Sequence, residues 1–384
     1  MEKNEKYAQD GVSISVGDAF SSFCGDICKA TYRNSPFVEV RDLSKGNFRG
    51  PRGFKIKGLP EECMLTMVVD GVGTKVIPIV ASGKLETAAS NVIAMTAMDI
   101  TRYGGLPLVF MNIFDVKSLG KLNSETYQMC QNAMIGLHEL ASQNSYVLLG
   151  GETAELGVCV GSDDPNAQLA FNWGGTMLGV YHPDKMIYGD MLKPGQAIIA
   201  LRDDFRSNGI SSVRKALQIR YGDNWFNNPE AMEDIIAAST ASTQYDRLLN
   251  YVHGWIGNHG KFSLEPLIPM HLIVHLSGGA FESKLGSDML KPQALSAELF
   301  GLFDPPEIMK KCAKWRGFSD EECYSTWNGG QGAIVVVDQE NVRKFIFLAE
   351  QFGVEAKLAG LITKKESHDV IIHSKFSLGK KICY

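Results

Sequence analysis

The strongest constraint on the fold is a recurring pattern in which a short apolar segment runs into a glycine-rich turn and a helical pattern follows. Residues 64–70 lead into "DGVGTK", and residues 146–151, "YVLLGG", end in two glycines. Small and apolar residues recur at helical spacing over 85–104 and 124–143, with a predicted strand over 106–116 between them. This alternation of strands and helices predicts a mixed α/β fold, in which 64–70 is a buried strand.

The second half of the chain repeats this alternation after a change of composition near residue 185. The segments predicted there are helices over 208–222, 243–255 and 339–352 and strands over 270–279 and 332–338. We therefore predict two α/β domains, 56–185 and 186–384, preceded by an N-terminal segment, 1–55. The glycine-rich stretch 43–58 is predicted to be a loop.

Composition narrows the class of protein. The 384 residues are 45% hydrophobic and 21% charged, as in an ordinary globular protein, and the net charge of −5 argues against a chain that coats nucleic acid or an anionic membrane. Eight cysteines occur without a CxxC pair, the first residues are polar, and no apolar run reaches about 18 residues. These features predict a reduced cytoplasmic protein without signal peptide or membrane span.

The "DGVGTK" turn has three interpretations. A phosphate-binding P-loop requires GxxxxGK[ST], and the spacing and order here are different, so that interpretation fails. Asp70 at a strand end suits a hard cation such as Mg²⁺, while Gly71 and Gly73 let the backbone approach a ligand closely. The remaining alternative is a purely structural turn.

Two further acidic motifs invite the same question. Asp99 lies in a helix of small and apolar residues, where a carboxylate is costly unless it is paired or metal-bound, although it can also be a polar helix end. Glu152 and Glu155 follow a strand and two glycines, a position where α/β proteins place ligand chemistry, although acidic residues also suit the first turn of a helix.

The second half offers glycine-rich segments beside predicted secondary structure. In "RSNGISSVRK", Ser207 or Asn208 can cap a helix, or Arg206 and the helix N-terminus can bind a phosphate. The segments 275–281 and 326–332 are each weak signals, and His275 alone is more typical of a structural histidine.

Taken in order, these motifs resemble the phosphoribosylformylglycinamidine cyclo-ligase (aminoimidazole ribonucleotide synthetase) family. The series is "DGVGTK", Asp99 followed by "GGLPL", "GGETAE", "SNGISSVRK", "HLSGGAF" and "NGGQG", and the resemblance extends from Asp10 to a strand near residue 373. It implies two α/β domains, with N-terminal domains that pair in a homodimer and close a barrel with their strands. It also implies ATP, Mg²⁺ and a ribonucleotide-like substrate, whose formyl amide oxygen is phosphorylated before the imidazole ring closes.

The resemblance also implies roles for individual residues. Metal ligands would be Asp70, Asp99 and Glu152, and catalytic positions would be Asp99, Lys75 and Arg206. ATP contacts would come from the N-terminal segment, the turn and the second domain: Lys29, Thr31, Gly50, Gly53, Asp70, Gly71, Gly73, Thr74, Glu152, Ser207, Asn208 and Gly209. The glycine-rich loop over 46–55 would close over the phosphates.

The chain departs from the family pattern at several positions. Arg206 replaces a usual His, Met98 a usual Asn, and both Asn91 and Asn172 replace expected acids. Arg49, Arg52 and Lys55 stand where the loop usually has glycines, and Ser242-Thr243-Gln244 replaces Pro-Thr-Arg. The positions expected to contact ATP and Mg²⁺ are better kept than those expected to contact the organic substrate.

Three hypotheses follow from these observations. The first is the cyclo-ligase reaction itself, a C–N bond-forming step of purine biosynthesis. The second is a divergent paralogue that uses ATP and Mg²⁺ to activate another amide or carboxylate. The third is a non-catalytic nucleotide-binding subunit, which the clustering of Asp70, Asp99 and Glu152 disfavours.

Overall fold

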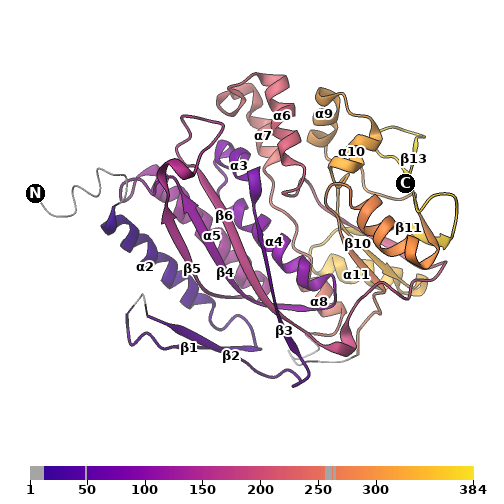
Figure 1. The fold of residues 1–384 in the computed structure, drawn as a ribbon, viewed down its shortest axis with the longest axis horizontal. Coiled ribbons are helices and arrows are strands. Elements are labelled where there is room, and N and C mark those ends of the chain that lie inside the picture. Colours follow the sequence, from indigo (N-terminus) through magenta and orange to yellow (C-terminus); the bar gives the residue numbers. More distant parts are fainter. Residues whose placement is uncertain (1–12, 48–49, 256–261, 263–264) are drawn as a thin grey trace, which may run out of the picture. The chain divides into compact units, whose positions relative to one another are not determined.

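The structure, a computed structural model, describes residues 13–47, 50–255, 262 and 265–384 (Figure 1). Its contacts divide the chain into two compact units. The first unit comprises Met1–Ala97 and Pro107–Val180, and the second unit comprises Met98–Leu106 and Tyr181–Tyr384. The main division therefore falls between residues 180 and 181, and a short segment that contains Asp99 joins the second unit.

The first unit contains a four-stranded sheet with the order β3-β6-β4-β5. Its strands are β3 (Met64–Gly71), β4 (Leu106–Val116), β5 (Val147–Glu155) and β6 (Phe171–Tyr181). Its helices are α2 (Ile14–Thr31), α3 (Val76–Ser82), α4 (Thr87–Thr101), which continues into the second unit, and α5 (Glu125–Asn144). β4 and β5 run parallel, with Asn112 opposite Gly151.

Aromatic side chains join this sheet to its helices. Phe114 of β4 packs against Phe20 of α2 and Trp173 of β6, and Phe20 also meets Tyr127 of α5 edge-on. Figure 1 shows α2 running beside β5. The helix was not predicted, because residues 14–31 mix apolar with small and polar side chains, and its apolar stripe is recognisable only once the partner strand is known.

Two sequence predictions for this unit were wrong. The stretch 43–58 is not wholly a loop, since β2 (Arg52–Ile56) pairs with β1 (Val38–Asp42) as an antiparallel hairpin. The strand at 64–70 is present but is not buried, because β3 is an edge strand whose Met67 and Val69 side chains are 66% and 73% exposed. Met111 and Ile113 of β4 are exposed as well, so one face of the sheet carries uncovered apolar side chains.

The second unit is built on a seven-stranded sheet with the order β13-β12-β9-β11-β7-β10-β8. The strands are β7 (Ala197–Arg202), β8 (Leu272–His275), β9 (Leu295–Leu299), β10 (Gln331–Val337), β11 (Ala356–Lys364), β12 (Val370–His373) and β13 (Lys381–Cys383). Neighbouring strands are antiparallel except β12 and β9, which are parallel.

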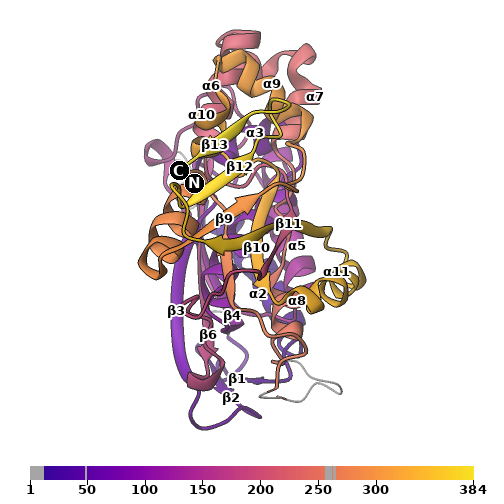
Figure 2. The same ribbon diagram turned by 90° about the vertical axis from the view of Figure 1, so that its right-hand side faces the viewer.

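Helices surround this second sheet. They are α6 (Ile210–Tyr221), α7 (Met232–Ala238), α8 (Asp246–Val252), α9 (Glu307–Arg316), α10 (Asp320–Thr326) and α11 (Val342–Gln351), with a π-helix, η6, at Phe281–Leu290. Separate hydrophobic cores lie on the two faces of the sheet, one formed with η6 and the other with α8 and α11. Figure 2 shows α8 and α11 together beside the strands. None of the described helices is long and apolar enough to cross a membrane.

Candidate functional site

The "DGVGTK" segment forms the end of β3 and a single 3-10 turn, Gly73–Lys75. Gly73 has φ +64°, a left-handed conformation that favours glycine. Asp70 is half-buried, and one carboxylate oxygen accepts a hydrogen bond from the Gly71 N–H at 2.6 Å. Thr74 is exposed beside Gly73, so the turn presents an acid, a glycine and a hydroxyl together.

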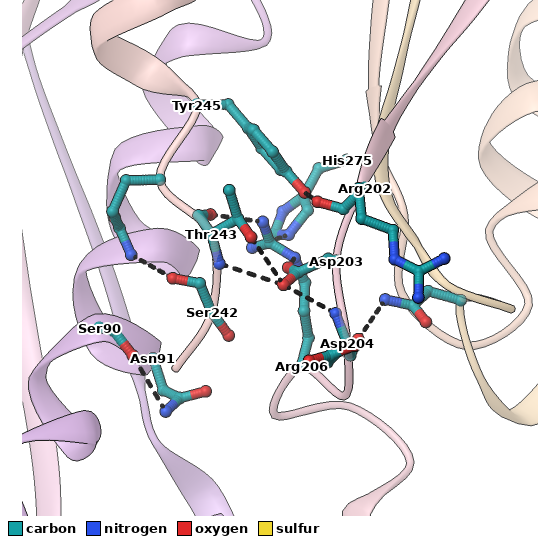
Figure 3. A network of polar contacts seen from close by, with 12 residues as sticks. Ser90, Asn91, Arg202, Asp203, Asp204, Arg206, Ser242, Thr243, Tyr245 and His275 are labelled. Carbon is teal, nitrogen blue, oxygen red and sulfur yellow. Dashed lines mark hydrogen bonds and ion pairs between the residues drawn. The ribbon is translucent and has the colours of Figure 1, made fainter. Parts of the chain in front are cut away.

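Lys75 points into the protein instead of towards solvent. Its side chain is fully buried, and its ammonium group donates to the Asn91 side-chain oxygen at 2.9 Å. Asn91 in turn donates to the Ser90 hydroxyl and to the Thr87 carbonyl, as Figure 3 shows for Ser90. The substitution of an expected acid by Asn91 thus leaves Lys75 with a neutral acceptor at this position.

Asp70 and Glu152 lie on opposite edges of the four-stranded sheet at about the same level. Trp173 of β6 contacts both neighbouring strands at this height of the sheet. Its carbonyl approaches Gly71, next to Asp70, and its indole N–H donates to the Asn112 side chain. Asn112 lies opposite Gly151, next to Glu152. Three strand spacings separate the backbones of the two acids, or about 14 Å. One chain therefore does not bring these two carboxylates onto a single ion.

A cavity of about 570 Å³ lies in the first unit between α2, β5 and the start of β2. Its polar lining includes Asp18, Arg52, Glu152 and Glu155. Glu152 is exposed, whereas Glu155 accepts hydrogen bonds from the Leu119 N–H at 2.7 Å and the Ser118 hydroxyl at 3.2 Å. Carboxylates outnumber guanidinium groups among these four residues, so the cavity favours a cation or a cation-bound phosphate over a bare anion.

Cys24 and Cys28 of α2 also line the cavity. Burial raises the pKa of the Cys24 thiol to about 12 and that of the Cys28 thiol to about 11. Both thiols are therefore protonated at neutral pH, and they contribute apolar surface instead of a nucleophile.

The N-terminal residues predicted to reach ATP have different surroundings. Lys29 is exposed and pairs with Asp26 at 3.3 Å. Thr31 is fully buried, donates to the Cys28 carbonyl at 2.7 Å and accepts from the Leu148 N–H at 2.9 Å, so it ties the end of α2 to β5. Gly50 closes a turn against Ser44, with no room for a Cβ, and Gly53 lies in β2. Arg49 lies outside the described residues.

Asp99 belongs to the second unit and is 39% exposed at the end of α4. Its carboxylate lies 3.6 Å from the Arg102 guanidinium, one helical turn away. Met98 beside it is buried in the core of the second unit. A half-exposed acid with one loose ion pair keeps a carboxylate oxygen available to a ligand.

Arg206 is fully enclosed by partners (Figure 3). Its guanidinium lies 2.6 Å from the Asp203 carboxylate, and both side chains are 1% exposed. Its other nitrogens meet the Thr243 carbonyl and the His275 ring at 3.0 Å each. Burial acts to lower the pKa of Arg206, but Asp203 and Tyr245 together outweigh this effect, so that the net direction is upwards.

The residues around Arg206 form a packed polar network. Asp203 also accepts from the Thr243 N–H and hydroxyl, while the Tyr245 hydroxyl donates to the Arg202 carbonyl at 2.6 Å. A Cβ at Gly332 would lie 2.2 Å from the Tyr245 hydroxyl, so only glycine fits there. Burial lowers the pKa of His275 well below its ordinary value, and the charge of Arg206 adds to this effect. Arg206 is therefore not a free phosphate ligand, in contrast to the sequence interpretation.

The Ser207-Asn208-Gly209 segment leads into α6. Asn208 is exposed, and Gly209, with φ +77°, packs tightly against the Thr326 carbonyl. The indole N–H of Trp327 donates to the Gly209 carbonyl at 3.1 Å. The segment is thus fixed on one side by Trp327, while Asn208 and the first turn of α6 remain accessible.

The predicted metal site is not assembled in this structure. Within the part of the chain that the structure describes, no three His, Cys, Asp or Glu side chains gather closely enough to hold a metal ion. Mg²⁺ usually keeps several waters and takes one or two protein carboxylates together with phosphate oxygens. Asp70 and Glu152 lie on different edge strands of the sheet, and each could supply one carboxylate to an Mg²⁺ ion that is otherwise held by water and phosphate.

Sequence reasoning missed several members of these groups. Asp203 lies three residues before Arg206, but this stretch is not helical, so the spacing did not indicate that the two charges pair. Thr243 was noted only as part of a departure from the family pattern, and Tyr245 and Gly332 were not singled out, because all three reach Arg206 only through the fold.

Comparison with known proteins shows which family and which enzymes this chain resembles. Residues 55–180 match the family described as AIR synthase related protein, N-terminal domain. The phosphoribosylformylglycinamidine cyclo-ligase of Desulfotalea psychrophila is 28% identical over 94% of this chain and 93% of its own length. The enzyme of the same name from Carboxydothermus hydrogenoformans is 29% identical over 81% and 84%.

Residues 55–180 thus match an AIR synthase related N-terminal domain, and the chain as a whole is similar to phosphoribosylformylglycinamidine cyclo-ligases.

Solved structures share the fold of this chain. Hydrogenase maturation protein HypE in complex with ATP superimposes with a TM-score of 0.57 at 14% identity, and covers 89% of each chain. Thiamine-monophosphate kinase from Stenotrophomonas maltophilia K279a gives a TM-score of 0.57 at 13% identity, over 92% of this chain and 96% of its own. The α/β fold predicted from the motif order is therefore confirmed.

Proposed function

We propose that this protein is an ATP-dependent cyclo-ligase that converts formylglycinamidine ribonucleotide to aminoimidazole ribonucleotide. One observation carries the proposal: relatives named as this cyclo-ligase match more than nine-tenths of the chain and of their own length, although identity is only 26–28%. The six motifs follow in the same order from the first unit into the second.

The reaction divides into two steps. The γ-phosphoryl group of ATP transfers to the formyl amide oxygen, and ADP leaves. An amidine nitrogen then attacks the activated carbon, phosphate leaves with that oxygen, and a proton is lost as the ring closes. Both steps depend mainly on the positioning of reactants and the neutralisation of charge.

The described residues support distinct tasks within this scheme. The half-exposed Asp99 carboxylate would accept the proton from the attacking nitrogen. Asn208 and the first turn of α6 would offer amide and N–H donors to an anionic group, whereas the Ser207 hydroxyl is buried. When bound, Mg²⁺ would neutralise ATP phosphate charge, and accessible Asp70 and Glu152 are the candidates to hold it.

Arg206 and Lys75 receive positioning tasks in this proposal. Arg206 would fix the loop before Ser207 through Asp203 and Thr243. Lys75 would fix the turn after Asp70 by its bond to Asn91. Thr31 would similarly anchor α2, so that Lys29 and not Thr31 is the candidate for direct ATP contact.

The uncovered face of the first unit supports a homodimer. Met67, Val69, Met111 and Ile113 expose apolar surface on one side of the four-stranded sheet. A second copy that covers this face would remove that surface from water, and closure of the two sheets into a barrel would also satisfy the β3 edge. Eight free cysteines fit a reducing, cytoplasmic setting.

A second candidate is a paralogue that activates a different amide or carboxylate. The neutral Asn91 and the enclosed Arg206 favour it, because both alter positions that the resemblance assigns near the reactants. Under this alternative ATP turnover would depend on another metabolite.

Turnover measurements test the proposal. Purified protein with Mg-ATP should release ADP only when formylglycinamidine ribonucleotide is present, and Asp99→Asn should lower kcat at least 100-fold without a change in melting temperature. No ADP release with that substrate, together with release on addition of a metabolite extract, would instead favour the paralogue.

A further inference from the structure

Asp99 lies in the last turn of α4, so the direction of its carboxylate depends on how this helix ends. The end is a Schellman motif, in which Gly104 has φ +83° and donates its N–H to the Thr101 carbonyl at 2.9 Å, while the Gly105 N–H donates to the Ile100 carbonyl at 3.2 Å. A weakly held helix end frays, and the side chains of its last turn then lose a fixed position. The contacts that hold Gly104 therefore also hold Asp99.

Gly104 is held by Trp255, which lies 151 residues away in the sequence but in the same unit. The buried indole N–H of Trp255 donates to the Gly104 carbonyl at 2.7 Å. The packing is tight, since a Cβ at Gly104 would lie 2.2 Å from the Lys185 carbonyl oxygen and 2.8 Å from Nε2 of His253. Because Gly104 is buried, loss of the indole donor would leave its carbonyl without this bond and favour another conformation of the turn.

Lys185 and His253 hold the chain that carries Trp255. The Lys185 ammonium group donates to the His253 carbonyl at 2.7 Å, and Nε2 of His253 lies 2.6 Å from the Lys185 carbonyl oxygen. A carbonyl oxygen only accepts, so Nε2 carries the ring proton of His253. The same ammonium group lies 5.9 Å from the centre of the Trp255 ring, within the range of a cation–π interaction. Since His253 is two residues before Trp255, these contacts fix the direction in which the indole points.

Arg102, the ion-pair partner of Asp99, belongs to the same helix end. Its Nε lies 3.6 Å from the Asp99 carboxylate, and its guanidinium lies 4.4 Å from the centre of the Tyr103 ring. The Tyr103 carbonyl accepts a hydrogen bond from the Ile187 N–H at 3.0 Å. The acid and the cation beside it therefore both depend on how residues 103–104 are held.

We propose that Trp255 is a positioning residue for the reaction, because its bond to the Gly104 carbonyl sets the orientation of the Asp99 carboxylate. This inference rests on the proposed function, in which Asp99 accepts a proton from the attacking nitrogen. A misplacement of about 1 Å costs on the order of 100-fold in rate, so loss of the bond should lower kcat. Trp255 acts through Asp99 and not on binding of the ground state, so KM should change little.

Kinetics of the full chain test this inference. Trp255→Phe keeps an aromatic ring but removes the donor, and Trp225→Phe, which alters another buried tryptophan of the same unit, is the matched control. With Mg-ATP and formylglycinamidine ribonucleotide, Trp255→Phe should lower kcat at least about 10-fold while both KM values stay within about twofold, and the control should keep kcat and KM. An unchanged kcat in Trp255→Phe would overturn the inference.

A double-mutant cycle distinguishes positioning from a general loss of structure. In the Asp99→Asn background, measured in single turnovers, Trp255→Phe should lower the rate no further, because its effect passes through Asp99. An equal loss of rate in both backgrounds would show a merely structural role and overturn the inference. If Trp255→Phe does not fold, Lys185→Met takes its place in the cycle, since it keeps the indole and removes the ammonium group beside it. The same two outcomes then decide.

A measurement without turnover separates this inference from the proposed function. In protein labelled with ¹³C at the aspartate carboxyl carbons, the resonance that Asp99→Asn removes identifies Asp99 by NMR. Its chemical shift should move in Trp255→Phe and stay in place in Trp225→Phe. A resonance that does not move in Trp255→Phe would overturn the positioning by Trp255, whether or not the wild type turns over. A resonance that moves in protein without turnover would refute the cyclo-ligase reaction alone and leave the positioning of Asp99 standing.

Discussion

The two sheets of the protein differ in how they are covered. In the second unit, β10 is buried at every position, because hydrophobic cores lie on both faces of the sheet. In the first unit, the β3 edge strand exposes Met67 and Val69, and Met111 and Ile113 of β4 are also uncovered. Sequence hydrophobicity is similar in the two strands, so apolar composition alone does not tell whether a strand is covered by its own chain.

The units also differ in how they bury charge. The second unit encloses the Arg206–Asp203 pair and the neutral His275, whereas the first unit buries Lys75 against the neutral Asn91. Buried networks of this kind are costly to break, because a group that loses its partner stays desolvated. The second unit should therefore respond more strongly to substitution and to acid than the first.

The largest effect is expected for Val335→Asp in β10. Val335 is fully buried between β7 and β8, and an unpaired carboxylate there has no route to water. The loss should exceed about 4 kcal/mol and prevent folding of the second unit. Circular dichroism and the soluble yield would measure this, and a variant that melts like wild type would contradict the placement of β10.

Arg206→Met should cost about 3–5 kcal/mol, because Asp203 keeps its charge in a buried site without its partner. Urea unfolding gives the free energy. The matched control is the double variant Asp203→Asn with Arg206→Met, which should recover part of the loss. Equal losses in the single and double variants would contradict the buried ion pair.

Acid should destabilise the second unit through His253. Burial lowers the pKa of His253 from 6.5 to about 4. Between these pH values the His253 ring is protonated in the unfolded chain but neutral in the folded chain. Stability is thus complete above pH 6.5 and falls by about 3 kcal/mol as the pH drops towards 4. Melting temperature against pH should show this slope, and His253→Gln should flatten it while the contribution of His275 remains. An unchanged slope in His253→Gln would refute the assignment.

Thr31→Val should cost about 1–2 kcal/mol, because the buried Leu148 N–H loses its acceptor. Thr31→Ser keeps the hydroxyl and serves as the control. If Thr31→Val instead kept its stability and lost ATP affinity, the hydroxyl would be an ATP ligand and not the anchor of α2.

The smallest effect on chain stability, below about 0.5 kcal/mol, is expected for Met67→Asp on the exposed face of β3. Its effect on assembly should be large, since a charge on the proposed dimer face opposes burial by a second copy. Sedimentation velocity should show a dimer for wild type and a monomer for Met67→Asp. A monomeric wild type would remove the explanation for the uncovered face.

Periodicity in the sequence predicted the elements whose signal is local. The strand predicted at 106–116 coincides with β4, and the helix predicted at 124–143 differs from α5 by one residue at each end. A strand was expected near residue 373, where β12 ends, but helix α2 and the strands β9, β11 and β13 were missed, because their burial depends on partners distant in sequence. Edge position, and hence the exposure of β3, follows from strand order, which hydrophobicity does not encode.

The candidate site was predictable to a similar extent. Motif order singled out Asp70, Asp99, Glu152 and the Ser207–Gly209 segment as site residues, but it did not foresee that the three acids are partly or wholly exposed and that the Ser207 hydroxyl is buried. It did not foresee that Lys75 and Arg206 are enclosed, since burial of a cation depends on Asn91 in one case and on Asp203 in the other. The roles of all these residues in catalysis remain predictions.

The most direct test of the central claim is the stoichiometry of a single reaction. Protein, Mg-ATP and formylglycinamidine ribonucleotide are combined, and ADP and aminoimidazole ribonucleotide are quantified in the same sample over time. The cyclo-ligase assignment predicts that the two products appear in a 1:1 ratio and that neither appears without the other. ADP formation without aminoimidazole ribonucleotide, or no reaction in protein that binds ATP, would contradict it.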